Sequence, residues 1–175
     1  MSEHSAPLEQ SEQMALSVAA DGLAILIRLL DREVSADLIA EMKRADAGAM
    51  FAEIAPVGQG REAGEALQAA LDALPDRPDT PTLDDLAADF ADCFLTHAYR
   101  LSPSGSVWMT VERLERQEPM FAVREWYEHY GLSAPDWRIR ADDHLVHELQ
   151  FVHHLLTLGD RVAAVDAAHR ADRRV

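Results

Sequence analysis

The sequence predicts an all-α, single-domain helical bundle of about eight or nine helices. Apolar residues recur three and four positions apart in almost every segment, which is typical of helices with one buried face. No segment of useful length alternates with a period of two, so no strand is expected. The chain has 175 residues and is 48% hydrophobic, which suits one domain with a substantial core. We expect that domain to span residues 1–175, with 1–13 as a flexible amino-terminal tail.

In the first half, an apolar stripe over 16–30 predicts the first helix. Ser35 is a good N-cap for a second helix that reaches about Ala45, and a stripe over 63–74 predicts a third. Residues 75–81 contain three prolines. Proline fixes φ and removes a hydrogen-bond donor, so this stretch is expected to be a stiff connector and a candidate hinge.

In the second half, Thr82 and Asp85 resemble a capping box that opens a helix over 83–98. Proline and glycine in 102–106 indicate a loop. The remaining pattern predicts a short helix over 107–114, a helix that starts at Pro119 and is capped by Gly131, a helix within 141–158 that follows a cap at Asp142 or Asp143, and a last helix over 160–171.

Charge and composition exclude several functions. The formal net charge is −15, which repels nucleic acid and attracts a basic peptide; the alternative is that it only confers solubility. The single cysteine forms no internal disulfide. The amino terminus is acidic where a signal peptide is basic, and Asp21 and Arg28 interrupt the apolar run that follows. We therefore expect a cytoplasmic protein without stable membrane insertion.

The sequence contains no recognisable catalytic or cofactor motif. His144, His147 and Glu148 read H-x-x-H-E, which is not the zinc-protease order H-E-x-x-H. Neither a G-x-S-x-G elbow nor a phosphate-binding loop with its lysine is present. We expect no catalytic residue, no metal site and no cofactor.

One feature of the 141–158 helix stands out. His144 and Glu148 are four residues apart and fall inside the apolar arc of this helix, where their side chains can meet. One interpretation is structural, in which the two groups satisfy each other or tie a loop to the helix. The other is that the arc faces a groove with an apolar floor and an acidic group, which would suit a peptide carrying arginines.

Three segments resemble the TorD/DmsD/NarJ family of redox-enzyme maturation chaperones. "DFADCFL" (89–95) is similar to the D-[FY]-x-x-x-F-[LI] helix of that family. "SVW" (106–108) stands where the family has E-S-V-[YW], and "DDHLVHELQFVHHL" (142–155) resembles P-D-H-x-x-x-E-L-x-F-[ML]. Tyr127 and Gly131 match a further helix. The departures are Gly105 for glutamate, Asp142 for proline and Val152 for methionine.

The resemblance implies a TorD-like fold and a chaperone without enzymatic activity. Its partners would be the twin-arginine signal peptide and the apo catalytic subunit of a molybdenum oxidoreductase, held back from export until the cofactor is inserted. Relatives occur as monomers or domain-swapped dimers. The peptide-binding candidates are Ser106, Trp108, Asp143, His144, Glu148 and Phe151. Asp143 and Glu148 would contact the arginines of the leader, His144 would orient Glu148 or a loop carbonyl, and Trp108 would form a groove wall.

Two other classes of function remain open on the sequence alone. One is a helical, histidine-rich metal-binding protein or enzyme. The other is a general scaffold that docks a helix of some other partner. The sequence does not identify the client oxidoreductase.

Overall fold

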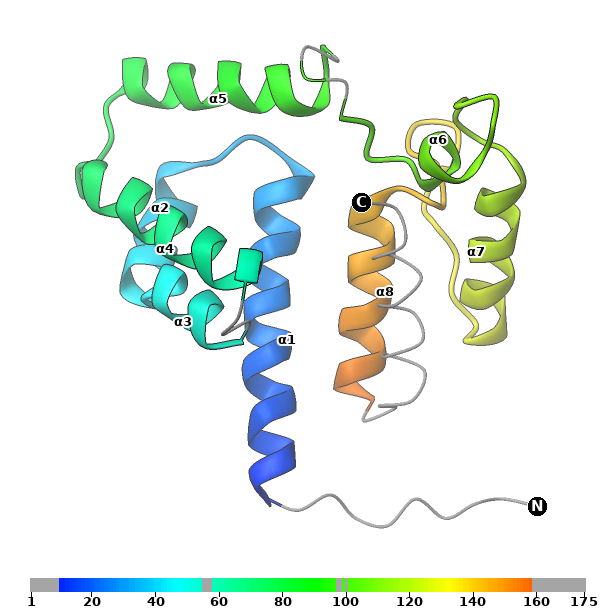
Figure 1. Cartoon of the computed structure of the whole chain (residues 1–175), viewed down its shortest axis with the longest axis horizontal. Helices are drawn as coiled ribbons and strands as arrows, with labels where there is room; N and C mark the ends of the chain where they lie inside the picture. Colours follow the sequence, from blue (N-terminus) through cyan, green and yellow to red (C-terminus); the bar gives the residue numbers. More distant parts are fainter. Residues whose placement is uncertain (1–9, 55–57, 97–98, 100, 159–175) are drawn as a thin grey trace.

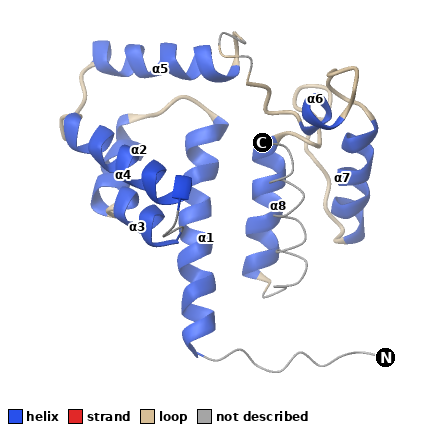
Figure 2. Cartoon of the chain, viewed as in Figure 1, coloured by secondary structure: helices blue, strands red, loops and turns tan. Residues whose placement is uncertain are grey.

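The computed structural model describes residues 10–54, 58–96, 99 and 101–158, and these ranges contain eight α-helices and no strand (Figure 2). The prediction of an all-α bundle is confirmed. The helices are α1 (Gln10–Asp31), α2 (Ala36–Arg44), α3 (Ala47–Ile54), α4 (Gly58–Ala73), α5 (Thr80–Phe94), α6 (Gly105–Met109), α7 (Glu118–His129) and α8 (Leu145–Thr157). The helix expected at 160–171 and most of the expected tail lie outside the described residues.

The long helix α1 separates two groups of helices (Figure 1). On one side α2, α3 and α4 pack together and against α1. Their buried core consists of Ile25, Leu38, Ile39, Met42, Ala47 and Leu71. Half-buried leucines at 83 and 86 of α5 pack onto the same core, so helices α1 to α5 all contribute to one apolar cluster.

Helices α3 and α4 approach each other closely because glycines lie at their contact. A Cβ atom at Gly64 would be 2.6 Å from the backbone nitrogen of Ala52, and one at Gly48 would be 2.4 Å from the Cβ of Gln68. Real Cβ atoms do not come so near to backbone atoms. The absence of two side chains therefore sets the spacing between these helices.

On its other side α1 packs along α8, which in turn packs against α7 (Figure 1). The second core contains Tyr127, Phe151 and Leu155. An ion pair between Arg140 and Asp31 joins the end of α1 to the loop before α8, and Arg140 Nη2 also donates to the Asp31 carbonyl at 3.1 Å. Helix α8 therefore lies between α1 and α7.

The observed helix ends can be compared with the capping residues that the sequence predicts. Ser35 caps α2 as expected, because its hydroxyl accepts from the Leu38 amide at 3.2 Å. Gly131 follows α7 with φ +70°, as a C-terminal glycine should. The predicted start of α5 was wrong: Asp79 is the N-cap, and its carboxylate accepts from both the amide and the hydroxyl of Thr82. Aspartate caps well, and Pro81 fits the first turn.

Helix α1 contains one stretch with the length and composition of a membrane span. Gln13–Asp31 is 19 residues long and contains an 18-residue window with a mean hydropathy of 1.6, although Asp21 and Arg28 interrupt the run. Core helices of soluble proteins and signal sequences have the same property. By itself this stretch is weak evidence of a span.

The contact between α3 and α4 leads to a prediction about Gly64. Helix propensity alone favours alanine over glycine by about 1 kcal/mol. The steric clash of an alanine Cβ at position 64 should cost more than the gain in helix propensity, because overpacking a tight contact costs about 1–3 kcal/mol. We expect Gly64→Ala to lower the free energy of unfolding in a denaturant titration. Ala63→Gly, at the exposed neighbouring position, is the control and should lower it by about 1 kcal/mol through propensity alone. A more stable Gly64→Ala variant would show that the helices separate freely.

Candidate functional site

Two short extended segments meet at the start of α8. The Leu145 amide donates to the Pro103 carbonyl and the Gly105 amide donates to the Asp143 carbonyl, both at 2.8 Å. These bonds form an antiparallel bridge between Ser104 and His144. The loop before α6 and the loop before α8 are therefore held together through their backbones, which brings two of the segments that resemble the family, 106–108 and 142–155, next to each other.

The carboxylate of Asp143 closes this junction. It accepts from the Ser106 amide at 2.5 Å and the Ser106 hydroxyl at 2.6 Å, and the Ser104 hydroxyl lies 3.3 Å from both of its oxygens. Asp143 and Ser106 are both 0% exposed. A buried carboxylate is costly unless hydrogen bonds replace its water, and donors to a charged acceptor form the stronger class of hydrogen bond. The Ser106 hydroxyl also accepts from the Gln117 amide at 3.0 Å, which extends the junction to the start of α7.

Asp142 ties the same segment to the middle of α7. Its carboxylate accepts from Arg124 Nε at 2.7 Å, and Arg124 Nη2 lies 2.6 Å from the same oxygen but at an angle that makes no hydrogen bond. The Tyr127 hydroxyl donates to the Asp142 carbonyl at 3.0 Å. In the sequence, Asp142 is a candidate cap and a departure from the proline of the family, and neither feature predicts its pairing with Arg124. No sequence pattern distinguishes Arg124 from the other arginines.

His144 is the N-cap of α8, not a residue of its first turn. Its ring Nδ1 accepts from the Val146 amide at 3.1 Å, so the expected cap at Asp142 or Asp143 was wrong. Those two carboxylates are occupied by Arg124 and the serines. Burial, followed by the charges of Arg140 and His147, lowers the pKa of His144 to about 4. The neutral ring that results is the form that can accept a hydrogen bond.

The other candidate residues are in different environments. Glu148 is 6% exposed in the first turn of α8, where a carboxylate is favoured by the helix dipole. Trp108 is 45% exposed, and its indole N–H donates to the Ser102 carbonyl at 2.7 Å. The groove predicted from the sequence would have Asp143 and Glu148 near its rim, whereas the structure buries both residues. Their contact with a peptide stays a prediction.

His147 is fixed in one orientation. Its Nδ1 lies 3.0 Å from the Ala141 carbonyl. A carbonyl only accepts, so Nδ1 carries the proton in this contact. Burial is the largest cause that lowers the pKa of His147, and the neutral ring then leaves Nε2 as an acceptor. His144 has the opposite arrangement, since its Nδ1 is the acceptor and its Nε2 carries the proton.

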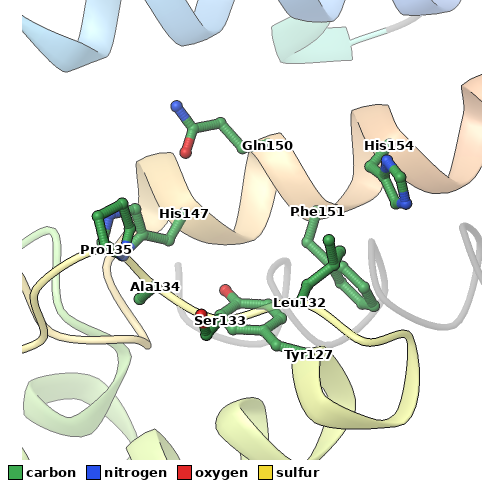
Figure 3. A pocket seen from close by; sticks show the side chains of 9 residues that line it. All are labelled: Tyr127, Leu132, Ser133, Ala134, Pro135, His147, Gln150, Phe151 and His154. Carbon is green, nitrogen blue, oxygen red and sulfur yellow. The ribbon is translucent and has the colours of Figure 1, made fainter.

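A recess of about 220 Å³ lies between α7, the 132–135 loop and α8. Figure 3 shows Tyr127, Leu132 and Phe151 gathered on one side of α8, and the same recess is lined by His147 and His154. Phe151 makes edge-to-face contacts with Tyr127 and Tyr130, with ring centres 5.0 and 5.5 Å apart. Phe151 is the predicted site residue that lines this recess. His144 lines a smaller cavity of about 70 Å³ between α1, α5 and α8.

The candidate site is thus divided between a junction and a recess. The structure brings Ser106, Asp143 and His144 together at the start of α8, and it places Phe151 further along the same helix. Among the described residues, no three histidine, cysteine, aspartate or glutamate side chains are grouped where they could hold a metal ion.

The junction predicts that Asp143→Asn destabilises the protein. Asparagine keeps the shape but replaces one accepting oxygen by a donor, which then faces donors of the serines. We expect a loss of about 1–3 kcal/mol in the free energy of unfolding. Asp84→Asn on the exposed face of α5 removes the same charge and should change stability by less than about 0.5 kcal/mol. Equal stabilities of the two variants would contradict the role of Asp143.

The cap at His144 predicts a pH dependence of stability. The pKa is about 4 in the folded protein against an ordinary value of 6.5, so the unfolded chain binds more protons between these values. The free energy of unfolding should therefore fall as the pH is lowered from about 6.5 towards about 4. His144→Asn retains a capping acceptor that does not titrate, and its stability should fall less steeply over this range in parallel denaturant titrations. His147, whose pKa is also lowered, accounts for part of the remaining slope.

Comparison with known protein families identifies the family to which the chain belongs. The model of the family described as nitrate reductase delta subunit matches residues 59–174, more than half of the chain. The matched range runs from the second residue of α4 through α8 and therefore includes both the junction and the recess. Comparisons with curated proteins and with solved structures find no match. The match confirms the TorD/DmsD/NarJ resemblance of the sequence, and the chain belongs to the nitrate reductase delta subunit family, a family of molybdoenzyme maturation chaperones.

Proposed function

We propose that this protein binds the twin-arginine signal peptide of a molybdopterin oxidoreductase, or its apo catalytic subunit, in the cytoplasm. It keeps the client from premature export while the cofactor is inserted. Membership of a molybdoenzyme chaperone family is the observation that carries this proposal. The task is one of binding, so the protein itself acts as a chaperone and not as an enzyme.

The charge of the protein supports a basic ligand. A formal net charge of −15 creates a field that accelerates encounter with a cationic peptide. The contribution falls with ionic strength because salt screens exposed charges over about 10 Å at 0.1 M. Nucleic acid is disfavoured for the same reason.

We propose different roles for the six candidate residues. Ser106, Asp143 and His144 act indirectly, since their hydrogen bonds hold α6 and α8 in position. Trp108 and Phe151 offer apolar contacts from these two helices. Glu148 is the carboxylate for an arginine of the leader, because it retains 6% exposure where Asp143 has none. A carboxylate with little competing water gives a strong charge-assisted contact.

The proposed assembly is a monomer or a domain-swapped dimer that binds one client chain per protomer. The link between α4 and α5 is the candidate hinge for a swap. It is tied to α2 in the structure, because Lys43 donates to the Leu74 carbonyl at 2.5 Å and pairs with Asp76 at 3.2 Å.

The proposal predicts a measurable affinity for a synthetic twin-arginine leader. We expect a dissociation constant near micromolar, or about −8 kcal/mol, by isothermal titration calorimetry. Raising the salt concentration should weaken binding, because part of the attraction is electrostatic. A leader with both arginines replaced by alanine is the control peptide. An unchanged dissociation constant for this peptide would refute the electrostatic argument.

Glu148→Gln separates a binding role from a structural one. We expect this variant to bind the leader more weakly by about 1–3 kcal/mol, since it loses a charge-assisted hydrogen bond. Asp143→Asn is the matched variant: it should lower the melting temperature more than Glu148→Gln does, yet bind the leader normally once folded. The reverse pattern in melting and calorimetry would assign the contact to Asp143 and the internal tie to Glu148.

A further inference from the structure

The recess between α7, the 132–135 loop and α8 is large enough for one side chain. Its volume is about 220 Å³, and its lining includes Tyr127, Leu132, Ala134, Pro135 and Phe151. A cavity of about 150 Å³ with comparable walls accommodates benzene. A phenyl ring therefore fits with room for its methylene group, whereas a helix does not.

The aromatic floor favours a ring as the occupant. Phe151 already meets Tyr127 and Tyr130 edge to face, at 5.0 and 5.5 Å between centres. A further ring placed on Phe151 extends this arrangement, and aromatic pairs of this geometry gain more than their buried area alone provides.

The rim of the recess offers a hydrogen-bond acceptor. His147 lines the recess, and its Nδ1 is engaged by the Ala141 carbonyl at 3.0 Å. The proton therefore resides on Nδ1, and Nε2 accepts. A ligand that places an N–H group beside its ring would satisfy this nitrogen.

The charges around the recess suit a basic ligand. Helix α7 has three exposed glutamates, at 118, 125 and 128, and its single arginine, Arg124, is paired with Asp142. Neither the 132–135 loop nor α8 contains a lysine or arginine. None of the described residues that line the recess is a lysine or arginine, although the charge of Arg140 reaches His147 at the rim and, besides burial, helps to lower its pKa.

We propose that this recess seats the phenylalanine that follows the paired arginines of an S-R-R-x-F-[LI] leader, with an N–H group of the leader donating to His147 Nε2. This inference rests on the proposed function and assigns the specificity of binding to one place on the molecule. The ring enters between α7 and α8, and the arginines lie over the glutamates of α7 and near the first turn of α8.

The test is a double-mutant cycle by calorimetry between the full-length protein and the synthetic leader. Ser133→Trp places a large side chain at the exposed edge of the recess, and Ala134→Leu fills it from the half-buried neighbouring position. For the wild-type protein, replacing the phenylalanine of the leader by alanine should weaken binding about 10- to 100-fold, as expected for burial of one aromatic ring. For the filled variants, both leaders should bind with the same reduced affinity.

Ser17→Trp is the matched control, since Ser17 is exposed on α1 and does not line the recess. It should reproduce the wild-type cycle, and the melting curves of all variants should confirm folding. If the leader binds and its phenylalanine contributes equally in wild-type and filled proteins, the assignment to this recess is wrong while the proposed function stands. If the leader does not bind the wild-type protein at all, the proposed function fails and this inference fails with it.

Discussion

The buried carboxylate of Asp143 is the contact on which the carboxy-terminal half of the molecule depends. It holds the N-cap and the first turn of α6 through Ser104 and Ser106, and Ser106 holds the N-cap residue of α7, Gln117. Because α8 begins immediately after this residue, three helices take their relative positions from a single side chain. Such a group stabilises only when its partners are all in place, since a buried charge with missing donors costs more than an apolar residue would.

This dependence separates the residues that shape the site from those that are available to a ligand. Residues 142–144 are used in hydrogen bonds and ion pairs with neighbouring segments. In the proposed binding mode, the leader contacts α8 one or two turns further along and the facing side of α7. On that proposal, a strongly patterned segment acts chiefly by building a scaffold, while the ligand contacts neighbouring residues with a less distinctive pattern.

The helices could be predicted from the sequence because their apolar stripes are local and periodic. The caps at Ser35 and Gly131 depend on adjacent residues only, and they too could be predicted. The burial of Asp143 could not, because its partners lie 37 and 39 positions away in the chain and a helical wheel does not show which acid turns inward. The capping role of His144 could not be predicted for the same reason. The carboxylates of Asp142 and Asp143, which the sequence offers as caps, bind distant residues, and the His144 ring caps α8 instead. Phe151 was found from its stripe, whereas Tyr127 and Leu132 join it only through the fold.

The ion pair between Arg140 and Asp31 spans 109 positions of the chain. At a translation rate of about 5–20 residues per second, Arg140 is made roughly 5–20 s after Asp31. During that interval α2, α3 and α4 are already available to cover one face of α1, while the face that later meets α8 has no partner. By this reasoning, a nascent chain of this protein leaves one apolar face of α1 uncovered for seconds, and transiently exposed surface of this kind promotes aggregation.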